Sequence, residues 1–308
     1  MSAKHIVFAT TGSLGDLHPF LALGCELQAR GYKVTIATTK AYAPNVAAAG
    51  LKFCYMRPDP EPSAQFHAAY MHPLTGGQFV YADYLAPAIR QSYEDLLEAS
   101  KDADLLVSQT LMALATPLVV ERTGIRWISA VFQPMSFFSV HDRPSYLPSS
   151  NLPSRLLQWL CAISPSVHRK VLHYVKIHTR AWVSPVFALR QELNLTAQTG
   201  GLKTSSNDVR LQRDTSLGVN KSSRDFLDAN TLSFTQRKLG AHLDLHSKQA
   251  AAQIKSSAVL DHLNAQQHPM FDAQHSPYCV LAMFSPLFGS PQPDWPAQTK
   301  QTGRGGFS

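Results

Sequence analysis

The chain has 308 residues, of which 44% are hydrophobic and 16% charged, and this is enough for one large or two ordinary domains. Such proportions indicate a packed globular core and exclude a disordered or fibrous chain. The net charge of +7 is weak evidence for an anionic membrane surface or a nucleotide as partner. Nucleic acid is disfavoured, because the 28 Lys and Arg form no run of five or more and no nucleic-acid-binding motif is present.

The cysteines and the amino-terminal segment bear on the compartment. Cys25, Cys54, Cys161 and Cys279 lie far apart without a CxxC pair, which favours buried free thiols in a reducing compartment. The first residues run directly into a strand and lack the pattern of a signal peptide, and no stretch is long and apolar enough for a membrane span. We expect a cytoplasmic protein that contacts a membrane only peripherally.

The first half of the chain alternates strand and helix signals. Apolar, β-branched runs predict strands, and residues 19–30 and 42–50 show helical spacing between them, with Gly31 and Gly50 as helix ends. The predicted strands of this part are 5–10, 33–38 and 51–56. Two such strands joined by a helix form a βαβ unit.

The same alternation continues to about residue 195. Helices are predicted over 79–100, 111–123 and, less regularly, 155–195, and strands over 104–108 and 126–132. Five strands with intervening helices predict an α/β fold with a doubly wound, Rossmann-like parallel sheet.

Composition changes near Gly200, and this change sets the predicted domain map. Residues 199–275 are polar and read as an insertion or an irregular segment, after which an apolar strand returns at 278–284. We therefore predict one domain from 1–198 plus 276–296, with 297–308 as the start of an interdomain linker.

The turn after the first strand, "FATTGSLGDLHPF" (8–20), has the strand, glycine and helix arrangement that binds phosphates. As a dinucleotide fingerprint it is broken, because a third glycine is missing and the second strand ends in "TTK" instead of an acid. No tyrosine has a lysine four residues later, which further opposes a nicotinamide-dependent reductase. A P-loop lysine is also missing after Gly12.

Asp16 is the more informative residue of this turn. It would repel a pyrophosphate, yet it is suitably placed to accept a proton from a hydroxyl at the carboxyl end of the sheet. From local chemistry alone, an aspartate before a helix that starts on Pro19 is better explained as a helix cap without a catalytic role. Both roles can be held by the same side chain.

The stretch "TTGSLGDLHPFLALGCELQARGYKVTIAT" resembles the amino-terminal signature of GT-B glycosyltransferases that act on lipids, sterols and natural products. The resemblance extends through "GIRWISAVFQPMSFFSVHDRP" (124–144) and returns at 276–303. It implies the amino-terminal, acceptor-binding half of a GT-B architecture. It also implies that Asp16, which follows Gly15, is the general base for the acceptor hydroxyl, with His18 as second choice.

The acceptor site is expected around the same turn and in the aromatic residues that follow the strands. Gly12, Ser13 and Gly15 would let backbone and substrate approach closely. Aromatic residues after the third strand (Phe66, Tyr70, Phe79, Tyr81 and Tyr84) and after the fifth (Phe132, Phe137, Phe138 and Tyr146) would line the pocket, with Phe137 and Phe138 preferred. Core packing is the equally weighted alternative.

The resemblance implies transfer of a hexose from a UDP- or dTDP-sugar to a hydroxyl of a lipid, sterol or other small lipophilic acceptor, with no metal and no cofactor. The family's donor-binding "HHGG" element is missing from these residues, so we expect a fragment or split enzyme that is inactive alone. The alternative is a non-catalytic module that binds a lipid or small molecule with the same fold.

Overall fold

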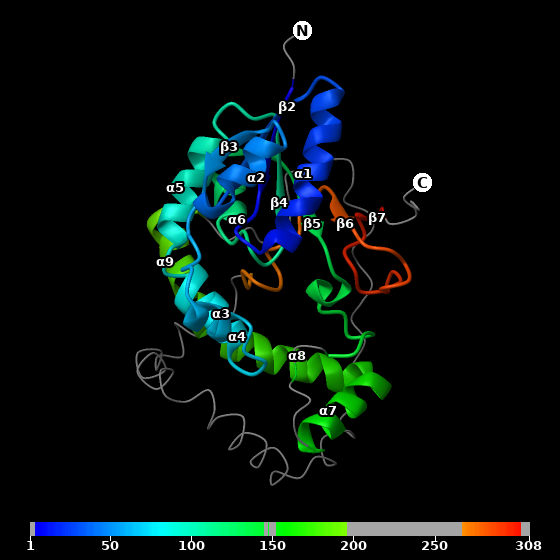
Figure 1. Ribbon diagram of the computed structural model, residues 1–308. Coiled ribbons are helices and arrows are strands. Elements are labelled where there is room, and N and C mark those ends of the chain that lie inside the picture. Colours follow the sequence, from blue (N-terminus) through cyan, green and yellow to red (C-terminus); the bar gives the residue numbers. More distant parts are fainter. Residues whose placement is uncertain (1–3, 145–146, 148–151, 196–266, 303–308) are drawn as a thin grey trace. The chain divides into compact units, whose positions relative to one another are not determined.

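The computed structural model describes residues 4–144, 147, 152–195 and 267–302, and their strands form one seven-stranded sheet (Figure 1). Every pairing is parallel, and the strand order is β3-β2-β1-β4-β5-β6-β7. The doubly wound α/β sheet predicted from the sequence is confirmed. Its strands are β1 His5–Ala9, β2 Lys33–Thr38, β3 Lys52–Tyr55, β4 Leu105–Gln109, β5 Arg126–Val131, β6 Val280–Ala282 and β7 Thr299–Gln301.

Helices connect the strands, and Figure 1 shows α1 and α5 on opposite sides of the sheet. The α-helices are α1 Leu14–Ala29, α2 Ala43–Ala48, α3 Ala64–Tyr70, α4 Gly76–Gln78, α5 Ile89–Ala99, α6 Thr116–Thr123, α7 Leu152–Ile163, α8 Pro165–Thr179 and α9 Ser184–Glu192. Shorter turns of 3-10 helix are η1 Lys40–Tyr42, η3 Pro134–Phe137 and η4 Arg180–Val183, and η2 Phe79–Leu85 is π-helical.

The core forms where apolar strand residues meet α1. Ile6 and Phe8 of β1 and their neighbours on β2 pack with Leu17 and Phe20, both of which are fully buried. The rings of Phe8 and Phe20 lie 5.0 Å apart. Burial of one such side chain contributes roughly 1.5–3 kcal/mol, so this contact fixes α1 firmly on the sheet.

Four predicted helices differ from the structure. The helix expected over 111–123 starts at Thr116, and the stretch expected over 155–195 is divided into α7, α8, η4 and α9. The helix expected from Pro19 starts at Leu14, because Ser13 caps it and because Leu17 and Phe20 must both lie on its buried face. The helix expected over 79–100 is divided into η2 and α5, because Pro87 has no N–H to continue the helical hydrogen bonds.

The carboxyl-terminal part of the described chain completes the sheet. β6 pairs with β5, and Thr299–Gln301, within the segment predicted as linker, pairs with β6 as edge strand β7. Thr302 N–H also donates to the Ala282 carbonyl at 3.0 Å, so backbone pairing holds the segment. Residues 267–275, predicted to be part of the polar segment, contribute buried His268, Met270 and Phe271. The remainder of that prediction, 199–266, and residues 303–308 lie outside the described residues.

The cysteines are free, as predicted, but Cys25 is exposed and Cys161 is the one that is buried. Within the described ranges, no helix combines the length and the apolarity needed to cross a membrane.

Candidate functional site

The strand order reverses between β1 and β4, because β2 and β3 follow on one side of β1 and the later strands on the other. In open α/β sheets ligands bind at this switch point, beyond the carboxyl ends of the strands. The chain leaves β1 through Thr10 to Ser13 and enters α1, and Gln109 is the last residue of β4. The turn that contains Asp16 therefore lies at the crevice where the topology predicts a site.

The Asp16 carboxylate is held by both sides of this crevice. Its Oδ2 atom accepts a hydrogen bond from the Ser13 backbone N–H at 2.6 Å and from the Ser13 hydroxyl at 2.9 Å. Its Oδ1 atom accepts from Gln109 Nε2 at 2.5 Å. Asp16 is thus the third residue of α1 and stabilises the helix start, as the capping interpretation requires, although the cap itself is Ser13.

Gln109 is in turn oriented by the strand beside it. Its Oε1 atom accepts a hydrogen bond from the Thr10 hydroxyl, and Thr10 Oγ1 accepts from the Gly12 N–H at 3.2 Å. Because Oε1 is engaged by Thr10, the amide must present its N–H groups to Asp16. The carboxylate has a fixed orientation and keeps acceptor capacity beyond the three hydrogen bonds it receives from the protein.

The two glycines of the turn have different structural roles. A Cβ atom on Gly12 would lie 2.2 Å from Asp16 Oδ2, so the carboxylate occupies the space that any side chain at Gly12 would need. A Cβ on Gly15 would meet only Ser13 Oγ, at 3.4 Å, which is an ordinary contact. Gly12 is therefore needed for the position of Asp16, and Gly15 is not.

The loop after β4 carries the second wall of the crevice. Leu111 has a φ of 70°, a left-handed conformation that is uncommon for a residue with a side chain. The Thr11 hydroxyl donates to the Met112 carbonyl at 2.6 Å, which ties this loop to the turn after β1. Strained residues held by such contacts concentrate at functional sites.

The charge of Asp16 contributes to the raised pKa of three tyrosines. Burial, together with the nearby Asp16 carboxylate, raises the pKa of Tyr70 to about 12 and also raises the pKa of Tyr42 and of Tyr81. These phenols stay protonated at neutral pH and can donate hydrogen bonds. A hydroxylated ligand beside Asp16 would meet donors from three different segments.

The aromatic residues predicted after the third strand gather in one cluster. The Phe66 ring lies 5.9 Å from Tyr70, 5.3 Å from Phe79 and 5.2 Å from Tyr84, measured between ring centroids. Tyr70 belongs both to this cluster and to the tyrosines whose pKa is raised in part by the Asp16 charge. Ser63 fixes α3 here by accepting the Phe66 N–H at 3.1 Å.

The phenylalanines predicted after the fifth strand are packed within the domain. Phe132 makes an edge contact with Phe20 at 5.2 Å, and Phe138 lies 4.5 Å from Phe271. Phe137 stacks between Trp295, at 4.1 Å, and His275, at 5.4 Å. His18 is exposed on α1. The structure brings Gly12, Ser13 and Asp16 together, whereas the three phenylalanines meet partners of their own.

Gln109 and Tyr42 are members of this site that the sequence reasoning missed. Gln109 follows the predicted strand 104–108 directly, and a polar residue at the carboxyl end of a buried strand is the signal that could have found it. Tyr42 is farther from its strand, because it ends the turn η1 that follows β2. Among the described residues, no group of three or more His, Cys, Asp or Glu is arranged to hold a metal ion.

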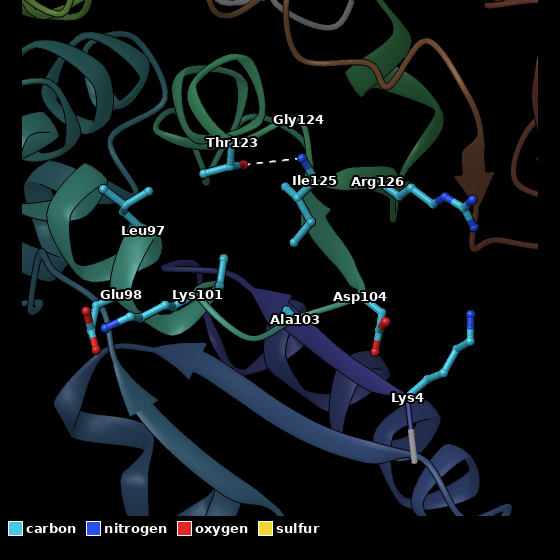
Figure 2. Close-up of a pocket in the computed structure, with 11 residues that line it drawn as sticks. Lys4, Leu97, Glu98, Lys101, Ala103, Asp104, Thr123, Gly124, Ile125 and Arg126 are labelled. Carbon is cyan, nitrogen blue, oxygen red and sulfur yellow. Dashed lines mark hydrogen bonds between the residues drawn. The ribbon is translucent and has the colours of Figure 1, made fainter. Parts of the chain in front are cut away.

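A hollow of about 730 Å³ lies at the amino-terminal ends of the strands (Figure 2). It is lined by the amino-terminal ends of the strands and by the ends of α5 and α6. Figure 2 shows Lys4, Asp104 and Arg126 on one side and Glu98 and Lys101 on the other, and all five are exposed. The Asp104 carboxylate accepts a hydrogen bond at 2.8 Å from the backbone N–H of His5, the first residue of β1.

The fold and the crevice define a Rossmann-like domain with a positioned carboxylate at its switch point. Residues 6–102 match the model of the glycosyltransferase family 28 N-terminal domain. This match includes the opening motif and agrees with its resemblance to the amino-terminal domain of GT-B glycosyltransferases.

Two characterised relatives align with this half of the chain. Glycosyltransferase GtfE of Amycolatopsis orientalis is 27% identical over 146 residues, which are 47% of this chain and 32% of that protein. A sterol 3-beta-glucosyltransferase of Candida albicans is 25% identical over 151 residues, 48% of this chain and 10% of its own length. The alignments thus span about a third or less of these relatives.

Among solved structures, a Streptomyces glycosyltransferase is 18% identical with a TM-score of 0.37, over 63% of this chain and 47% of its own. The fold assignment rests on the strand order and not on this overlap.

Proposed function

We propose that this domain is the acceptor-binding part of a glycosyltransferase that uses a nucleoside diphosphate sugar and a small lipophilic acceptor with a hydroxyl group. The observation that supports this proposal is the Asp16 carboxylate, which is oriented by Ser13 and Gln109 beside the aromatic cluster of Phe66. The apolar cluster suits a sterol-like or lipid acceptor, and the tyrosine hydroxyls suit its polar end.

In the proposed reaction Asp16 is the general base. The acceptor oxygen forms a bond to the anomeric carbon of the sugar, while the bond from that carbon to the diphosphate oxygen breaks. Asp16 takes the proton of the acceptor hydroxyl, and the nucleoside diphosphate leaves with its electron pair. The aspartate forms no covalent bond to the sugar. His18, which is exposed on α1, is the second candidate for a role in this proton transfer.

The departing diphosphate needs hydrogen-bond donors of its own, whereas this proposal assigns the tyrosine hydroxyls to the acceptor. We therefore propose that a separate donor-binding domain supplies them. The 308-residue chain by itself would bind acceptor weakly and would neither hold a nucleotide sugar tightly nor transfer it. Calorimetry with UDP- and dTDP-sugars tests this step, and micromolar donor affinity would contradict it.

The function is tested by joining the chain to the donor-binding domain of a GT-B enzyme and measuring sugar transfer to sterols and hydroxylated fatty acids. Transfer by the joined protein, together with acceptor binding by the chain alone, supports the proposal. Acceptor binding without transfer would favour the non-catalytic binding module. Absence of acceptor binding would contradict both.

A further inference from the structure

The outer face of α7 carries large apolar side chains that the domain leaves uncovered. Leu152, Leu156, Trp159 and Ile163 are 78%, 55%, 57% and 58% exposed. Their spacing of four, three and four residues places them within about 60° of one another around the helix. Cys161, on the opposite side of α7, is 1% exposed. The helix therefore presents a continuous apolar stripe to the outside.

The charge around this stripe has one sign only. Between residues 143 and 191 the chain has no Asp or Glu, and it has seven Lys or Arg, which equals the net charge of +7 for the whole chain. Two of these cations make ion pairs inside the domain, Lys176 with Asp272 and Arg190 with Glu121. Exposed cations remain on α7 and at the start of α8, namely Arg155, Arg169 and Lys170.

The position of these cations relative to the stripe indicates that both belong to one binding surface. Arg155 lies on α7 between Leu152 and Leu156, and α8 begins two residues after α7 ends and packs against it. Figure 1 labels the two helices next to each other. An exposed tryptophan with leucine and isoleucine, flanked by Arg and Lys, is the composition of a helix that lies in the plane of a membrane interface.

We propose that α7 with the first half of α8 is a docking surface for an anionic lipid bilayer. The apolar stripe would enter the boundary between headgroups and acyl chains, and Arg155, Arg169 and Lys170 would lie among the lipid phosphates. The absence of acidic residues from the whole stretch favours a uniformly negative partner over a protein surface of mixed charge. This inference does not depend on the role of Asp16.

The test is flotation of the full 308-residue chain with phosphatidylcholine vesicles that contain or lack phosphatidylglycerol. We expect binding to the anionic vesicles at least tenfold tighter than to neutral ones, and weaker at high salt. The double substitution Leu156→Ser with Trp159→Ser should reduce this binding by roughly tenfold or more. The matched control is Met71→Ser with Leu74→Ser, which are 75% and 50% exposed on another element and should leave binding unchanged.

Charge is tested in the same way. Replacing Arg155, Arg169 and Lys170 by Gln should lower affinity for anionic vesicles by on the order of 100-fold at low salt. The control replaces three exposed cations elsewhere, Lys33, Lys52 and Arg126, by Gln. An equal loss in the control would show that net charge alone attracts the chain, and it would overturn the proposed surface.

Tryptophan fluorescence provides a second measurement, with the conservative variant Trp159→Phe, that does not depend on a variant that could fail to fold. Trp159→Phe should still bind vesicles, and it should lose the blue shift of emission that an exposed tryptophan shows on entering lipid. Unchanged binding after Leu156→Ser with Trp159→Ser would overturn the proposal. A chain that fails to bind vesicles but forms a dimer that this double variant disrupts would also overturn it, because a second copy would then be the occupant.

Discussion

The amino-terminal and carboxyl-terminal ends of the parallel strands, called here the amino edge and the carboxyl edge, differ in how their polar side chains are held. At the amino edge, the hollow of about 730 Å³ is lined by exposed charges such as Lys4, Lys101 and Arg126. At the carboxyl ends of the strands, Asp16 receives hydrogen bonds from both sides of the switch point. We propose that the preorganised Asp16 carboxylate, and not this hollow, marks the functional end of the strands.

Among substitutions that leave Asp16 itself unchanged, the largest effect is expected from Gly12→Ala. The new methyl group would lie 2.2 Å from Asp16 Oδ2 and must displace the carboxylate. Turnover of the protein joined to a donor domain should fall by roughly 100-fold, the usual size of a general-base contribution. Gly15→Ala is the matched control, since its methyl group makes only a 3.4 Å contact. Equal losses in the two variants would contradict the distinct role of Gly12.

Gln109→Leu should have the next largest effect. It keeps the size of the side chain but removes the N–H donor to Asp16 Oδ1 and the acceptor for the Thr10 hydroxyl. A hydrogen bond to a charged group is worth about 1.5–3 kcal/mol, so kcat should fall roughly tenfold or more while KM for the acceptor changes little. Gln91→Leu on α5 is the control. A change in KM alone would show that Gln109 contacts substrate and does not position the base.

The sequence allowed most of the sheet to be predicted, because strands buried on both faces appear as continuous apolar runs. Asp16 could also be located, since glycine, acid and proline stand together in a few residues. Gln109 could not be recognised as its partner, because 93 residues separate the two and only the parallel pairing of β1 with β4 joins them. β7 was missed because three polar residues at a sheet edge have no apolar pattern.

His268 is fully buried, and its burial predicts that the folded domain loses stability in acid. Burial lowers the pKa of His268 from 6.5 to about 3, and its Nδ1 atom accepts the Met270 N–H at 3.2 Å. Below pH 6.5 this histidine binds a proton in the unfolded chain but stays neutral in the folded chain. The free energy of unfolding therefore decreases as the pH is lowered. One such group accounts for about 2 kcal/mol between pH 7 and 5.

Urea unfolding at these two pH values measures this effect. His268→Gln, whose side chain can still accept a hydrogen bond, should make stability less dependent on pH. His18→Gln, at an exposed position, should not. A wild-type chain that is equally stable at both pH values would contradict the assignment of His268 as a buried neutral histidine.

The smallest effect is expected at the amino edge. Lys101→Gln and Arg126→Gln change exposed residues of the large hollow, and surface substitutions of this kind usually alter free energies by less than about 0.5 kcal/mol. Sugar transfer by the joined protein should therefore stay within roughly twofold of the unmodified value. A larger loss would show that the amino edge takes part in sugar transfer and would contradict the assignment of function to the carboxyl edge.

The central claim is that the Asp16 carboxylate acts as the base. It is tested most directly by kcat/KM of Asp16→Asn in the protein joined to a donor domain. Asn keeps the shape and can still accept the Ser13 N–H, so folding and acceptor affinity should persist while kcat/KM falls by roughly 100-fold or more. Ser13→Ala, which removes one hydrogen-bond donor and keeps the carboxylate, is the control. Unchanged turnover in Asp16→Asn would contradict the account and leave Asp16 with its role at the start of α1 alone.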